Sequence, residues 1–272
     1  MVPPIIKDLF RIKKFDISLA LFVGIMLTGV FGSILYNVNP LAVVGPPEQP
    51  PSNRFPLGTN SWGRDNLALL LSGIESSIYI GLTAALISLA IGVVIGVISG
   101  FKSGFTDSSL MLVTDVVLVL PSILIMMLIA AYLRERNPFF VSIIIGLTSW
   151  PWVARAVRSQ MLSLKTREFM YMSRMAGLRD MRIIAEDLLP NMMSYIFMAF
   201  VLLMSGAMIA EAGLSMIGLG VTKGTSLGII LYWAQILEAV RRGLWWWFIP
   251  PGVCLVALAT SLLLLSTALD EY

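Results

Sequence analysis

Long apolar segments alternate with short polar ones along most of the chain. Each apolar segment has about the 20 residues that a helix needs to cross a hydrocarbon layer of roughly 30 Å. A backbone in lipid must satisfy its own hydrogen bonds, and continuous rather than alternating apolar runs therefore favour helices over a barrel. The pattern predicts an all-α polytopic membrane protein with six transmembrane helices. We place them at 17–37, 76–100, 109–132, 139–157, 194–218 and 244–267.

The polar connectors divide the chain further. Residues 1–16 form an N-terminal segment, 38–75 a long connector whose prolines keep its first part extended, and 268–272 a short tail. Between them, 76–267 is a five-helix core interrupted by the charged, helix-compatible segment 158–193. The first apolar segment is too long for the core of a cleavable signal, and we expect it to be retained.

Composition supports lipid as the solvent. Fifty-seven per cent of the 272 residues are hydrophobic, 13 per cent are charged and the mean hydropathy is +0.86, whereas soluble domains carry roughly 25 per cent charged residues. The chain has no histidine and one cysteine, Cys254. This excludes a disulfide framework and argues against a metal site.

The distribution of positive charge predicts the orientation. Twelve of the 19 Lys and Arg residues lie in segments that share a side with the N-terminus, and seven lie on the other side. Because cytoplasmic loops carry the excess of Lys and Arg, we expect both termini and 158–193 in the cytoplasm and 38–75 outside. The expected location is the plasma membrane.

A few residues inside the spans invite a functional interpretation. Gly92, Gly96 and Gly100 form a strip that lets another helix approach closely, within the chain or at a subunit interface. Tight packing within the chain is the favoured interpretation. Asp115 and Glu211 are costly in lipid and should face protein or water. A packing hydrogen bond is favoured over a proton relay, because neither acid has an evident basic partner within the membrane.

The segment from Thr166 to Asn191 has a helical pattern of its own. Phe169, Met172, Met175 and Ala176 recur at the spacing of one helix face. Gly177 then breaks or caps that helix, and a second short helix should follow and end at Pro190. An apolar helix face that lies outside the membrane must be covered, either by a soluble protein or by the membrane surface.

This segment resembles the coupling loop of ABC-importer permeases, the EAA motif. It matches the peptide-permease version at Arg174, Gly177, Asp180, Leu189, Pro190 and Asn191. It departs from the motif at Tyr171, Met172 and Ser173, which replace Glu-Ala-Ala, and at Asp187, where the pattern has an aliphatic residue.

Other segments resemble C-type dipeptide, oligopeptide and nickel permeases, in order, over about residues 55–260. They are FPLGTNSWGRD at 55–65, Asp107, Asp115 and Pro121, WPW at 150–152 with Arg155 and Arg158, EAGLSMIGLG at 211–220, and Trp247 with Pro250–Gly252. The C-terminal tail differs from that of the family.

The resemblance implies a type I ABC importer permease fold and a set of partners. These are a second homologous permease, two ATP-binding cassette subunits and an extracellular binding protein, besides the lipid bilayer, with no role for nucleic acid. ATP and Mg²⁺ would be bound by the ATPase subunits, and no cofactor by this chain. The residues expected to couple to the ATPase are Glu168, Phe169, Met172, Ser173, Arg174, Gly177, Asp180, Leu189 and Pro190.

The substrate and two other functions stay open. Peptides are favoured over oligosaccharides, nickel ranks last because histidine is absent, and no substrate-binding residue is identified. A membrane enzyme would need a nucleophile with a base, or a metal cluster. The only candidate is an aspartyl-type pair of Asp115 and Glu211. An ion-driven transporter should show inverted repeats, which we do not find. The Gly-rich stretch 220–225 lacks the Gly-Lys order of a phosphate loop.

Overall fold

The computed structural model describes residues 13–270, and their regular structure is helical. Predictions for residues 1–12 and 271–272 fall outside this range. The helices are α2 (Lys13–Leu35), α3 (Asn66–Lys102), α4 (Gly104–Val119), α5 (Ser122–Tyr132), α6 (Pro138–Ser149), α7 (Pro151–Leu164), α8 (Glu168–Met175), α9 (Asp180–Arg182), α10 (Leu189–Met216), α11 (Leu227–Ile236) and α12 (Trp245–Asp270). A π-helical segment, Ile183–Leu188, joins α9 to α10.

The helices provide six spans when each bent pair counts as one. Four stretches are single spans: α2, α3, α12 and the continuous helix Asp180–Met216. The pairs α4–α5 and α6–α7 are bent by 81° and 47°. The all-α, six-span prediction is therefore confirmed for the described residues.

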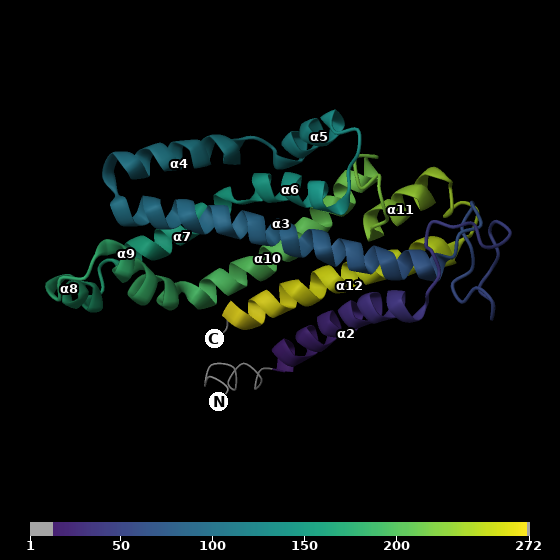
Figure 1. The fold of residues 1–272 in the computed structure, drawn as a ribbon, viewed down its shortest axis with the longest axis horizontal. Helices are drawn as coiled ribbons and strands as arrows, with labels where there is room; N and C mark the ends of the chain where they lie inside the picture. Colours follow the sequence, from purple (N-terminus) through teal and green to yellow (C-terminus); the bar gives the residue numbers. More distant parts are fainter. Residues whose placement is uncertain (1–12, 271–272) are drawn as a thin grey trace.

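The long helix α3 runs through the middle of the bundle (Figure 1). It packs against α7, α6, α10 and α2, and α2 packs also against α12. The connector and α11 lie at one end of the bundle, and α8 and α9 lie at the opposite end (Figure 1). The two surfaces expected to meet different partners are thus separated by the length of the bundle.

Helix α3 begins ten residues before the predicted span. Asp65 caps it, because its carboxylate accepts hydrogen bonds from the backbone N–H groups of Leu67 and Ala68 at 2.8 and 3.0 Å. The Tyr36 hydroxyl donates to the same carboxylate at 2.8 Å. The irregular connector is therefore shorter than the predicted 38–75, and its two ends are joined at this cap.

Proline shapes the bends and the start of α10. Pro121 follows Leu120, which is forced into an extended conformation (φ −76°, ψ 129°) that ends α4. Pro190 was expected to stop a short helix, and this is wrong: it lies in the first turn of α10, within the continuous helix from Asp180 to Met216. Proline cannot donate the N–H that a regular helix needs at this position, and the helix is π-helical just before it, over Ile183–Leu188.

Candidate coupling site

Helix α8 follows the end of α7 in the chain and has apolar side chains on its exposed face. Tyr171, Met172 and Met175 are 61, 64 and 88 % exposed, although they belong to an eight-residue helix with charged neighbours. The prediction that Phe169 shares this face is wrong, because Phe169 packs against the main hydrophobic core beside the buried Met170. The inward side anchors α8, and the outward side leaves an apolar surface to be covered.

Gly177 ends α8 in a Schellman motif. Its φ is +72°, its N–H donates to the Arg174 carbonyl at 3.0 Å, and the Leu178 N–H donates to the Ser173 carbonyl at 3.2 Å. A Cβ at this position would meet nothing within 4 Å. The backbone conformation, and not a close approach, is therefore what calls for glycine here.

The two halves of the loop are joined by residues that depart from the family motif. The Ser173 hydroxyl donates to the Asp187 carboxylate at 2.6 Å across the turn. Asn191 donates to the Asp187 carbonyl at 2.6 Å. The serine and the aspartate that break the pattern thus stabilise each other, which a single sequence does not reveal.

The remaining predicted coupling residues surround this turn. Glu168, Arg174, Asp180 and Pro190 are exposed, and Leu189 packs partly against the main core. Arg182, which was not singled out, pairs with Glu186 one helical turn later at 2.8 Å. The site is therefore an apolar patch with charges of both signs around it.

The glycine strip of α3 holds α7, the helix that carries this loop. A Cβ at Gly96 would lie 2.6 Å from the Ala154 carbonyl oxygen, and one at Gly92 would lie 3.0 Å from the Trp150 carbonyl oxygen. A Cβ at Gly100 would lie 2.7 Å from that of Met161. The strip packs against α7 of the same chain, as the favoured interpretation of these glycines requires.

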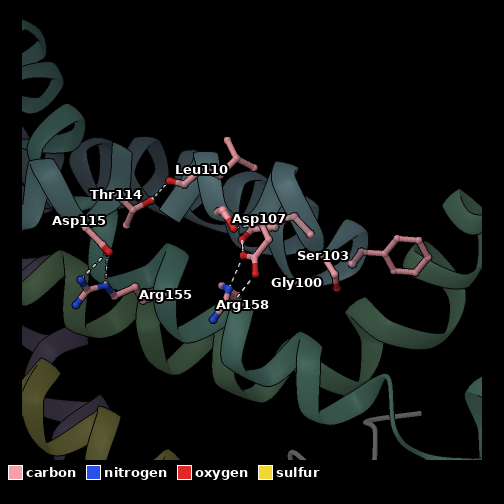
Figure 2. Close-up of polar contacts among 12 residues, drawn as sticks. Gly100, Ser103, Asp107, Leu110, Thr114, Asp115, Arg155 and Arg158 are labelled. Atoms are coloured by element: carbon pink, nitrogen blue, oxygen red, sulfur yellow. Dashed lines mark hydrogen bonds and ion pairs between the residues drawn. The ribbon is translucent and has the colours of Figure 1, made fainter. Parts of the chain in front are cut away.

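Two ion pairs join α4 to α7 (Figure 2). Asp107 binds Arg158 through two hydrogen bonds of 2.6 Å and also accepts one from Ser99. Asp115 binds Arg155 at 2.6 Å. The expectation that Asp115 lacks a basic partner is wrong, because Arg155 lies 40 residues away in sequence but beside it in the fold.

The two ion pairs differ in their surroundings. The side chains of Asp107 and Arg158 are 15 and 32 % exposed, whereas those of Asp115 and Arg155 are 50 and 54 % exposed. Lys165 adds a third link, since its ammonium donates to the carbonyls of Gly100 and Phe101 at 3.1 and 2.7 Å. The ends of α3 and α7 and the start of α4 thus form one connected block that supports α8.

Glu211 lies elsewhere and has a different role. It is fully buried, and one of its oxygens accepts hydrogen bonds from Ser215 and Ser226 at 2.7 and 2.6 Å. Ser226 is the N-cap of α11, so Glu211 fixes the short helix at the opposite end of the bundle. Asp115 is bound to Arg155 instead, and no aspartyl-type pair forms between the two acids.

Comparison with known proteins agrees with this architecture. The family described as "Binding-protein-dependent transport system inner membrane component" matches residues 92–271. A Brucella suis protein named as a peptide transport system permease is 32 % identical over 97 % of this chain and 88 % of its own length. The oligopeptide transport system permease OppC of Bacillus subtilis is 34 % identical over 78 % of this chain and 70 % of its own length.

A solved structure shows the same fold. A chain of the MetNI methionine ABC transporter, in an inward-facing conformation, superposes with a TM-score of 0.58 at 19 % identity and covers 75 % of this chain and 94 % of that one. Together with the family match over residues 92–271, this confirms the resemblance read from the sequence. The chain belongs to the family of binding-protein-dependent transport system inner membrane components, the membrane-spanning permeases of ABC importers.

Proposed function

We propose that this chain is one of two permease subunits of an ATP-driven importer of peptides, and that α8 is where it meets an ATPase subunit. The observation that carries the proposal is the exposed patch of Tyr171, Met172 and Met175 on a helix held by the block of α3, α4 and α7. Relatives named as peptide permeases support the substrate class.

The distribution of positive charge supports one orientation of the bundle. The positive-charge bias puts α8 in the cytoplasm, and the connector and α11 lie at the opposite end, where an extracellular binding protein would dock (Figure 1). ATP and Mg²⁺ would be held by the two ATPase subunits. A second, homologous permease would complete the translocation pathway.

The arrangement supports a route by which closure of the ATPase subunits would move the pathway. Closure of the ATPase pair on ATP would shift α8, which is anchored on its inner side by Met170 and Phe169. Because α7 is held to α3 by the glycine strip and to α4 by ion pairs, a displacement of α8 passes to three spans at once. Such coupling requires that α8 bind the ATPase in both the inward-open and outward-open states.

Reconstitution of the complete complex tests the proposal. Met172→Glu and Met175→Glu place a charge in a contact that must lose water, so we expect weaker binding of the ATPase subunits and at least tenfold slower peptide uptake. Val240→Glu is the matched control for ATPase binding, which it should leave unchanged, because Val240 is 67 % exposed at the other end of the bundle. Normal docking and uptake in both methionine variants would refute the role of α8.

A further inference from the structure

Two spans are interrupted beside the same cavity. The break between α4 and α5 is at Leu120–Pro121, and the break between α6 and α7 is at Trp150. The cavity has a volume of about 410 Å³, and α10 lines its third side. Its lining consists of Val117, Leu118, Leu120, Pro121, Ser122, Met126, Thr148, Ser149, Pro151, Trp152, Leu202, Leu203, Gly206, Ala207 and Ala210.

The breaks leave backbone groups without partners in the helices. Pro121 has no N–H to give to the carbonyl of Val117, four residues earlier in α4. Pro151 in the same way withholds a hydrogen from the carbonyl of Leu147 in α6. Both breaks therefore withhold an N–H from a carbonyl of the preceding helix, and Val117 is among the residues that line the cavity.

Such a backbone cannot face lipid. Irregular backbone at membrane depth is tolerated only where protein covers it or where it lines a water-filled cavity. Leu120, Pro121 and Ser122 are nevertheless exposed in this chain. Across the cavity Gly206 is also exposed, and a Cβ there would meet nothing within 4 Å.

The chemistry of the residues that line the cavity indicates which class of substrate it can accept. No charged side chain is among the lining residues, which offer hydroxyls from Ser122, Thr148 and Ser149 beside apolar groups. Backbone acceptors and hydroxyls complement the N–H groups that every peptide carries, whatever its side chains.

We propose that this cavity is this chain's share of the translocation pathway, and that its carbonyls and hydroxyls accept hydrogen bonds from the backbone of the passing peptide. The proposal rests on the proposed function. It adds the location of the pathway, on the face where both breaks meet α10, and a recognition chemistry that is independent of peptide sequence.

Cysteine accessibility in the assembled transporter tests the location. In a Cys254→Ser background, Ser122→Cys and Gly206→Cys should react with a membrane-impermeant, charged methanethiosulfonate, and the reaction should slow at least threefold with saturating peptide-loaded binding protein. Gly24→Cys and Val256→Cys, which lie on α2 and α12, are the controls: Gly24 also has open space at its Cβ, Val256 is 65 % exposed, and neither should react. Absence of labelling at both 122 and 206, or their cross-linking to the second permease alone, would overturn the inference.

Blocking the cavity gives an independent result. Gly206→Trp should reduce uptake at least tenfold while ATP hydrolysis by the complex continues, and Gly24→Trp should leave both unchanged. Full uptake in Gly206→Trp would refute the pathway location but leave the proposed function intact. A wild-type complex that hydrolyses ATP without importing any peptide would instead refute the proposed function.

Discussion

Replacement of Gly96 by alanine tests the packing that holds α7 in place. The added Cβ would lie 2.6 Å from the Ala154 carbonyl oxygen and 2.7 Å from the Val157 Cβ, against the 3.4 Å or more of ordinary contact. Neither atom can turn away, because one is backbone and the other is attached to it. The two helices must therefore separate by several tenths of an ångström.

The change in the free energy of unfolding is the difference between a packing cost and a gain in helix propensity. Overpacking of this kind costs about 1–3 kcal/mol, while alanine gains about 0.8–1.0 kcal/mol over glycine in helix propensity. We expect Gly96→Ala to destabilise the protein by about 1 kcal/mol, and Gly92→Ala/Gly96→Ala by about 2 kcal/mol. In lipid the loss is not offset by a hydrophobic term, since helices there associate through close packing.

Reversible unfolding in mixed detergent micelles measures this difference. Gly213→Ala is the control on α10, because a Cβ there would meet nothing within 4 Å. It should be neutral or up to about 1 kcal/mol more stable. Equal stability of Gly96→Ala and Gly213→Ala would mean that α3 and α7 do not pack along this strip.

Three further predictions concern other contacts. Arg158→Met should destabilise the protein by about 3 kcal/mol, because it leaves Asp107 largely buried without its partner. Arg155→Met removes a half-exposed pair and should cost under about 1 kcal/mol. Equal free energies of unfolding for the two variants would contradict this difference. Gly177→Val should weaken binding of the ATPase subunits and Gly243→Val should not, although both glycines have φ +72° and open surroundings. Equal ATPase binding in the two variants would argue against a coupling role for Gly177. Burial and the hydrogen bond to Asp65 raise the pKa of Tyr36 to about 12. The stability that the protonated Tyr36 hydroxyl contributes is therefore complete below pH 10 and is lost as the pH rises through 12. Tyr36→Phe should remove this part of the pH dependence of the free energy of unfolding.

The spans were predictable because lipid imposes a strong and local constraint. A continuous apolar run of sufficient length has few alternatives to a helix, and each predicted span has a helical counterpart in the structure. The bends at Pro121 and Pro151 were not predicted, since proline within an apolar run does not indicate an angle. Helix α11 was missed because its ten residues are too few to span the membrane.

The coupling site was predictable only in part. The helix, the turn at Gly177 and the exposure of Met172 and Met175 follow from local spacing. The partners of Asp115 and Ser173 lie 40 and 14 residues away, and no periodicity along one chain links such positions. Phe169 shows a further limit of prediction from the sequence. Helical spacing indicates which residues share a face of the helix, but it does not indicate which part of that face the core covers.

Contact between α8 and an ATPase subunit is tested most directly by cross-linking from Met175, which is 88 % exposed. In membranes that contain the whole transporter and Cys254→Ser as background, Met175→Cys should cross-link to an ATPase subunit and react with impermeant thiol reagents from the cytoplasmic side. Val240→Cys should do neither and should react from the outside. Labelling of Met175→Cys from the external side, or no cross-link to an ATPase subunit, would contradict the role assigned to α8.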